Sequence, residues 1–191
     1  MLKIIAITAG VTVAASGLLF VAAQITAPDT RTYCVSRPVT FPDQGVAGWR
    51  GEQLENAASI MRAGKALGIE REGQVLGVMA AMGESSLHNI DYGDWETSGV
   101  TNPDGTRTSS IGLFQQQAWW GSVDERMNPT TASTMFFTRL QRVRDWQQLP
   151  PSHAIHRVQI NSDPEHYARF EADATSVVAA LSGSCATPTP R

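Results

Sequence analysis

Two stretches of the chain repeat hydrophobic residues at the spacing of a helix. Residues 51–67 place apolar side chains three and four positions apart on one stripe, and residues 70–87 are apolar on almost every side. A helix at the surface needs one apolar face, whereas a helix that is apolar all round is buried. The second stretch therefore predicts the central helix of the fold.

Three later segments also predict helices, because each opens at or beside a proline and continues with helical periodicity. They are residues 128–143, 151–160 and 164–181. No convincing run of alternating β-branched residues accompanies them. The predicted fold class is mostly α, with a single domain over residues 50–182, since 191 residues of which 42% are hydrophobic can build one substantial core.

Residues 89–110 interrupt this helical pattern. Gly, Asp, Asn, Thr and Ser dominate the segment, and no apolar periodicity runs through it. Loops of this length inside a small domain are usually functional or mobile. We therefore expect a long polar loop beside the site that carries the chemistry.

The two ends of the chain carry other signals. Residues 4–23 form an apolar run that ends in small residues, which indicates export across the cytoplasmic membrane to the cell envelope or the medium. A cleaved signal peptide is favoured for residues 1–23, and membrane attachment through this run is the alternative, because about 20 apolar residues suffice to cross a bilayer. Residues 24–49 are then an exported N-terminal segment, and residues 183–191 a disordered tail.

The charge pattern limits the partners of the protein. The formal net charge is −3 and no lysine or arginine cluster forms a stripe, so the chain lacks the basic surface by which proteins bind nucleic acids. The four histidines show no metal-ligand spacing with cysteine or acidic residues. We expect a monomer with no nucleic-acid partner, no metal and no cofactor.

Glu84 stands out because it ends the apolar stretch. A negative charge at a helix C-terminus opposes the helix dipole, so packing alone would favour Lys, Arg or Gly there. Gly77, Ala80 and Ala81 precede it at helical spacing, which predicts a face of small residues that can hold a cleft. A carboxyl group desolvated in a cleft has a raised pKa and can protonate a glycosidic oxygen. A structural glutamate hydrogen-bonded to a loop is the alternative.

Two short motifs lie on either side of the polar loop. The first is "MGESSLHNIDYGD", which contains Glu84 and Ser85, and the second is "SSIGLFQQ", which contains Gly112, Leu113, Phe114 and Gln115. Together they resemble the lysozyme-like peptidoglycan-cleaving domains, especially the lytic transglycosylases and the related actinobacterial cell-wall and phage proteins. The motifs occur in the order of that family, and the resemblance extends over residues 50–182.

The resemblance implies a lysozyme-like fold in which Glu84 is the general acid and base. It implies that the Gly112–Gln115 segment lines the cleft opposite Glu84, and that Ser85 also lies at the substrate. Tyr167 lies in a region comparable to that of an aromatic-Asn element that the family often carries on a later helix. The chain departs from the family at residues 95–110, which form a longer insertion than transglycosylases usually have between the two motifs.

The resemblance also implies peptidoglycan glycan strands as the substrate, and the number of carboxyl groups separates two reactions. A hydrolase needs a second Asp or Glu about 5 to 9.5 Å from the first. Asp91, Asp94 and Asp104 lie in the loop, but nothing in the sequence fixes one of them beside Glu84. A lytic transglycosylase, which needs one glutamate, is therefore favoured. Hydrolysis with Asp94 positioning water is the first alternative, and a non-catalytic cell-wall-binding protein is the second.

Aromatic residues near the two motifs are candidates for stacking on sugar rings. Tyr92 and Trp95 follow the first motif, and Trp119 and Trp120 follow the second. Tyr92 is the stronger candidate. We expect it to contact the substrate together with Asp91 and Asp94.

Cys34 and Cys185 flank the predicted domain, and they are the two cysteines of the sequence. Because exported proteins form disulfides in oxidising compartments, we predict that the two are joined, with two free thiols as the alternative. Closing so long a loop would stabilise the fold by up to about 5 kcal/mol in the chain-entropy model. Peptide mapping without reductant should recover one linked peptide pair from the exported protein. Recovery of both cysteines as free thiols would contradict the prediction.

Overall fold

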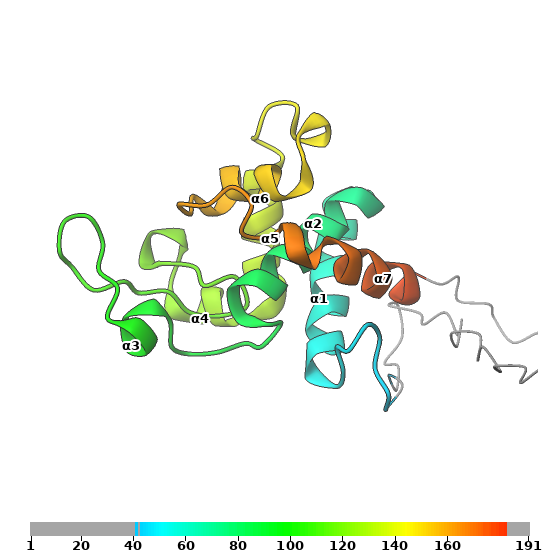
Figure 1. Ribbon diagram of the computed structural model, residues 1–191, viewed down its shortest axis with the longest axis horizontal. Helices are drawn as coiled ribbons and strands as arrows, with labels where there is room; N and C mark the ends of the chain where they lie inside the picture. Colours follow the sequence, from blue (N-terminus) through cyan, green and yellow to red (C-terminus); the bar gives the residue numbers. More distant parts are fainter. Residues whose placement is uncertain (1–40, 42, 183–191) are drawn as a thin grey trace, which may run out of the picture.

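The computed structural model describes residue 41 and residues 43–182, and this part of the chain is mostly helical, which confirms the predicted class (Figure 1). Its α-helices are α1 (Glu52–Ala66), α2 (Arg71–Ser85), α3 (Asp94–Ser98), α4 (Val123–Met127), α5 (Pro129–Leu140), α6 (Pro151–Gln159) and α7 (Glu171–Leu181). Three 3₁₀ turns accompany them: η1 (Ala118–Trp120), η2 (Trp146–Gln148) and η3 (Ala168–Phe170). Within the described residues, β-structure is limited to isolated bridges.

Helix α2 is the centre of the hydrophobic core, as its apolar composition predicts. Its residues from Leu76 to Met82 are buried, and α1, α5, α6 and α7 all contact it. These helices gather on one side of the molecule, where α7 crosses close to α1 and α2 (Figure 1). The predicted helices at 51–67, 70–87, 128–143 and 151–160 correspond to α1, α2, α5 and α6.

The face of α2 that carries small residues is packed against other helices. The prediction of a cleft along this face is therefore wrong. Ala80 and Ala81 have no exposed surface. The ring of Phe137 from α5 lies against Gly77, where an added Cβ would come within 2.5 Å of the ring carbon Cζ. The small residues therefore let two helices approach closely, as dense core packing requires.

Residues 164–181 do not form one helix, contrary to their periodicity. Residues 164–167 make a turn that leads into η3, and α7 begins at Glu171. The hydroxyl group of Ser152 in α6 accepts the N–H of Tyr167 at 3.1 Å and donates to the carbonyl of Pro164 at 2.6 Å. These two bonds hold the chain in a turn against α6, and this turn positions Tyr167.

The polar segment between α2 and α4 forms a lobe beside the helices, and it contains α3 and an irregular loop that extends furthest from them (Figure 1). Most of it is irregular, as its composition predicts, but α3 and an isolated bridge between Thr101 and Arg107 give it local structure. The guanidinium group of Arg107 covers the ring of Trp95 at 4.6 Å from the centroid. This cation–π contact joins the two sides of the insertion.

Helix α4 follows this lobe and is not predicted by hydrophobic periodicity. Its start is fixed by a capping box, in which the N–H of Glu125 donates to Ser122 Oγ at 3.3 Å and the N–H of Ser122 donates to Glu125 Oε2 at 2.8 Å. A serine followed three residues later by a glutamate is the sequence signal of this cap. That signal, rather than an apolar stripe, identifies the helix.

The residues before α1 pack on α7. The indole N–H of Trp49 donates to Asp173 Oδ2 at 3.2 Å, and the Trp49 ring meets Phe170 edge-on at 6.4 Å between centroids. The packed structure therefore includes the end of the segment 24–49.

Several sequence predictions lie outside the described residues. They concern the segment 1–23, the pair Cys34 and Cys185, and the tail 183–191. Among the residues that the structure does describe, no helix combines the length and the hydropathy needed to cross a bilayer.

Candidate active site

Glu84 lies in the last turn of α2 and is half-buried, and residues from much later in the sequence contact its carboxyl group. The hydroxyl group of Tyr167 donates a hydrogen bond to Glu84 Oε1. The side-chain amide of Gln159, the last residue of α6, lies near the carboxyl group and lowers its pKa. Directly after Glu84 and Ser85 the chain turns away, since Ser86 adopts a left-handed conformation with φ 53°.

Burial raises the pKa of Glu84 from its usual 4.5 to about 7. The loss of water around the carboxylate is the main cause, and the side chains of Tyr167 and Gln159 oppose it. The negative charge of Asp94 in the loop raises the pKa of Glu84 further. Near neutral pH both the acid and the base form of Glu84 are therefore populated, as a group that must give and then take a proton requires.

Tyr167 is fully buried, at 0% exposure, so the prediction that it contacts the substrate directly is wrong. Its ring lies against the backbone of Gly83, where an added Cβ would come within 2.6 Å of the ring. Burial raises the pKa of Tyr167, and the nearby Glu84 raises it further. The phenol therefore stays protonated and acts as a hydrogen-bond donor to Glu84, which makes it a positioning residue.

Within the second motif, the Gly112–Gln115 segment begins at a position that requires glycine. Its φ is +78°, and an added Cβ would come within 2.3 Å of the carbonyl oxygen of Arg126. In this conformation its N–H donates to the carbonyl of Ile90 at 2.7 Å. The motif is thereby joined to the loop that follows Glu84.

The central residues of the second motif face the core. Leu113 and Phe114 are 0% and 1% exposed, so their side chains do not line an open cleft as expected. The buried Ser85 donates to the carbonyl of Leu113 at 2.8 Å, and Gln159 donates to the carbonyl of Phe114 at 2.8 Å. The prediction of substrate contact is therefore wrong for Ser85, whose hydroxyl group instead joins the two motifs.

Gln115, in the second motif, is half-buried and holds the loop in place. Its side-chain amide donates to the carbonyls of Tyr92 and Gly112, each at 3.2 Å, and its backbone is left-handed with φ 46°. This residue thus connects the motif to the start of α3, where Asp94 lies.

The loop residues predicted to contact a sugar are accessible. Asp91 and Asp94 are exposed, and Tyr92 keeps 46% of its surface in water. Asp104 is different, because its Oδ1 accepts both the N–H and the hydroxyl group of Thr106, at 3.0 and 2.6 Å. These bonds lower the pKa of Asp104 and give it a role in the turn.

Arg126 is a residue of this region that the sequence reasoning misses. It is buried, and its guanidinium group donates to four backbone carbonyls of the loop, those of Ser109, Gln116, Gly121 and Ser122, at 2.7 to 3.3 Å. Burial lowers the pKa of Arg126. A single arginine in a short segment gives no periodic signal, so only the fold reveals it.

The two tryptophans that follow the second motif have no described contact with the Glu84 carboxyl group. Trp119 is 54% exposed, and the guanidinium group of Arg139 lies 4.4 Å from the Trp119 ring centroid and 3.5 Å from that of Trp120. No group of three His, Cys, Asp or Glu residues suited to a metal ion occurs in the described part of the chain.

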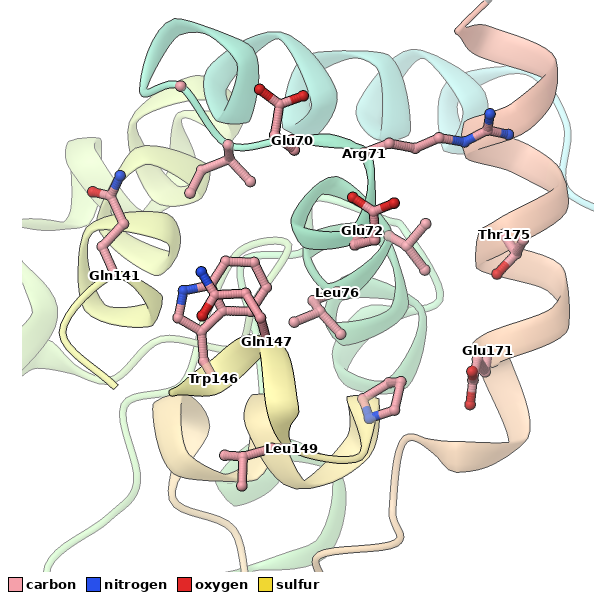
Figure 2. A pocket seen from close by; sticks show the side chains of 14 residues that line it. Glu70, Arg71, Glu72, Leu76, Gln141, Trp146, Gln147, Leu149, Glu171 and Thr175 are labelled. Carbon is pink, nitrogen blue, oxygen red and sulfur yellow. The ribbon is translucent and has the colours of Figure 1, made fainter. Parts of the chain in front are cut away.

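A cleft of about 790 Å³ lies elsewhere, at the opposite end of α2 (Figure 2). Trp146 and Leu149 line its floor, while the carboxyl groups of Glu70, Glu72 and Glu171 stand at its rim. These carboxyl groups are exposed to water. They therefore lack the burial that gives Glu84 its acid character, and the geometry favours Glu84 as the reactive group.

No protein-family model matches the chain, and no curated protein matches it. The assignment of a reaction therefore rests on the geometry around Glu84 and on the two sequence motifs.

We predict that Gly112→Ala destabilises the fold by about 2 to 4 kcal/mol, because it combines a left-handed backbone with a clash against Arg126. The matched control is Gly105→Ala in the exposed turn, where φ is also positive, at +82°, but nothing lies within 4 Å of the added Cβ. That variant should lose only the conformational share, about 1 kcal/mol. Urea unfolding measures both. Equal losses would show that the contact with Arg126 carries no weight.

Proposed function

We propose that the protein is an exported enzyme that cleaves the β-1,4 bond between MurNAc and GlcNAc in peptidoglycan, as a lytic transglycosylase. The observation that carries the proposal is a protonatable carboxyl group, Glu84, enclosed at the junction of the two motifs with a pKa of about 7. The resemblance of the motifs to lysozyme-like domains supports the substrate class and a lysozyme-like form of the helical fold. We also propose that the enzyme acts as a monomer in the cell envelope or outside the cell.

In the first step the protonated Glu84 gives its proton to the glycosidic oxygen. The bond between that oxygen and C1 of MurNAc breaks, and the GlcNAc side leaves with a free hydroxyl group. The N-acetyl oxygen of the substrate stabilises the positive charge that develops at C1. Glu84 is left as a carboxylate, which the side chains of Tyr167 and Gln159 stabilise.

In the second step the same carboxylate takes the proton of the C6 hydroxyl group. The C6 oxygen then attacks C1 and displaces the N-acetyl oxygen, so that a 1,6-anhydro ring forms. Glu84 returns to its protonated state, and no water is consumed. A single group with a pKa near the working pH serves both proton transfers.

Hydrolysis is the second candidate, and one observation favours it. Asp94 lies close enough for its charge to raise the pKa of Glu84, and its exposed side chain is open to solvent. A carboxylate in that position can orient water for attack at C1. We place transglycosylation first because the described contacts of the Glu84 carboxyl group come from Tyr167 and Gln159, and neither supplies a second carboxylate.

A non-catalytic cell-wall-binding protein is less consistent with this geometry. Keeping a carboxyl group desolvated costs stability once it ionises. A protein that only bound glycan would gain by replacing Glu84 with a neutral residue that accepts the same hydrogen bond from Tyr167.

We predict that Glu84→Gln lowers peptidoglycan cleavage by at least about 100-fold, because the amide keeps the shape but has no proton to transfer. The matched control is Glu72→Gln, an exposed carboxyl group on the same helix, which should leave cleavage unchanged. Mass spectrometry of digested peptidoglycan identifies the reaction. Anhydro-MurNAc ends are expected, whereas free reducing ends that disappear in Asp94→Asn would establish hydrolysis.

The difference in stability between Glu84→Gln and the parent should depend on pH. Because folding raises the pKa of Glu84 from 4.5 to about 7, the folded protein holds this proton more tightly, and the resulting stability is lost as pH rises through that window. Glu84→Gln should therefore match the parent below that window and be more stable at about pH 8, by up to about 3 kcal/mol. Cleavage within a few-fold of the parent would make Glu84 a structural residue and remove the proposed function.

A further inference from the structure

The two tryptophans that follow the second motif form an exposed surface together with one arginine. The rings of Trp119 and Trp120, in η1, lie 5.2 Å apart between centroids. The guanidinium group of Arg139, from α5, lies 4.4 Å from the first centroid and 3.5 Å from the second. Trp119 still keeps 54% of its surface in water. We call these three side chains the tryptophan–arginine platform.

The backbone on both sides of the platform is fixed by hydrogen bonds. The buried Arg126 donates to the carbonyl of Gln116 before η1 at 2.9 Å, and to the carbonyl of Gly121 after it at 3.0 Å. Within η1, the N–H of Ala118 donates to Ser109 Oγ at 2.9 Å. A surface that is ordered before a ligand arrives loses little entropy on binding, which favours the platform as a binding site.

Arg139 is half-buried and has no anionic partner in the described part of the chain. Burial lowers the pKa of Arg139, and the positive charge of Arg142 lowers it further. The described contacts of its guanidinium group are the two tryptophan rings, with no salt bridge and no hydrogen bond beside them. Glu125 lies against Gly121, but its Oε2 already accepts two hydrogen bonds from Ser122. The charge and the N–H donors of Arg139 therefore remain for an anion from outside the chain.

The chemistry of the platform defines the ligand that fits it. The exposed face of an indole ring takes the apolar face of a sugar ring by stacking, and a guanidinium group takes a carboxylate through two parallel hydrogen bonds. Because Arg139 lies against both tryptophan rings, that carboxylate must be attached close to the stacked sugar. In peptidoglycan the lactyl group of MurNAc meets this requirement. Its carboxylate is free where the stem peptide has been removed, and is a neutral amide where the peptide remains.

The platform lies within reach of a glycan strand held at Glu84. Trp119 follows Gln115 by four residues, so the Cα atoms of the two are at most about 14 Å apart. Gln115 in turn bonds to the carbonyl of Tyr92, in the loop that follows Glu84, at 3.2 Å. A strand of several sugars that passes Glu84 can therefore extend to the platform.

We propose that the tryptophan–arginine platform is a second glycan subsite, which binds a MurNAc residue whose lactyl carboxylate is free. Trp119 stacks on the sugar ring, Arg139 binds the carboxylate, and Trp120 supports the guanidinium group from below. The inference rests on the proposed function, because it takes peptidoglycan as the substrate. It adds a preference for strands from which the hydrolysis of an amide bond has already removed the stem peptides.

Isothermal titration calorimetry on the full chain tests this preference, in a Glu84→Gln background that spares the probe from cleavage. One probe is the tetrasaccharide (GlcNAc–MurNAc)₂ with free lactyl carboxylates. The other is the same tetrasaccharide with each carboxylate converted to a methyl amide, which mimics the bond to a stem peptide. We expect the acid to bind about tenfold more tightly than the amide, as one charge-assisted pair provides. Equal affinities, or no binding of either probe, would overturn the inference.

Two substitutions assign the preference to the platform. Arg139→Gln should reduce the affinity for the acid to that for the amide, and so abolish the preference. Trp119→Ala should weaken both probes about fivefold and leave the preference in place, because both carry the sugar ring that stacks. A structural role of Arg139 would instead weaken both probes equally. A preference that survives Arg139→Gln would also overturn the inference.

The matched control is Arg142→Gln, which removes an exposed arginine three positions further along the chain that has no described contact with either ring. It should keep the ratio of the two affinities within about twofold of that of the parent, since exposed charges are screened by salt. An equal change in Arg139→Gln and Arg142→Gln would show that net charge, and not the platform, holds the carboxylate.

NMR of the indole N–H groups tests the contact without any substitution in the platform. Addition of the acid tetrasaccharide should shift the signal of Trp119. The signal of Trp49 should stay in place, because its indole donates to Asp173 on α7. Trp119→Phe and Trp49→Phe assign the two signals. A Trp119 signal that does not move would overturn the inference.

The failure of this inference and the failure of the proposed function are distinguishable. If the acid and the amide bind equally while Glu84→Gln abolishes cleavage of peptidoglycan, only the subsite fails. If Glu84→Gln cleaves as well as the parent, or neither cleaves, the proposed function fails. The ratio of the two affinities and the Trp119 signal then still decide whether the platform binds the carboxylate-bearing sugar.

Discussion

The hydrogen bond between Tyr167 and Glu84 joins residues 83 positions apart, and the arrangement of the site depends on it. It ties the end of α2 to the turn between α6 and α7. The same turn is fixed by Ser152, and the neighbouring Gln159 reaches both Glu84 and the second motif. A carboxyl group at this position would otherwise face the dipole of its own helix and the core without a partner. The two ends of the site are therefore joined around one group that is costly to bury.

The elements that could be predicted from the sequence are those whose signal is local. The stripe of residues 51–67 and the apolar run of residues 70–87 identify helices because a side chain's place on a helix follows from its neighbours three and four positions away. Gly112 could also be expected to be special, since a glycine in a polar motif often marks a left-handed turn. Periodicity failed at residues 164–170, where two bonds from Ser152 outweigh the helical preference of the segment.

The parts that could not be predicted depend on contacts between distant segments. The family resemblance placed Ser85 and Tyr167 at the substrate, whereas the fold buries both and gives their hydroxyl groups internal partners. Arg126 holds the segments on either side of the second motif by donating to four backbone carbonyls. Its neighbours in the sequence do not indicate these four acceptors. In physical terms, a buried polar group must find a partner somewhere, but its sequence neighbours do not say where.

Desolvation connects the stability of the protein to its proposed chemistry. The burial that raises the pKa of Glu84 costs folding free energy above neutral pH, and the same burial keeps the proton available for a glycosidic oxygen. The raised pKa of Glu84 can be measured directly, by following the carbon-13 NMR signal of its carboxyl carbon as the pH changes. Glu84→Gln assigns the signal. We expect a midpoint at about 7. A midpoint at the usual value of 4.5 would contradict it, because Glu84 would then be ionised at neutral pH and could not act as an acid.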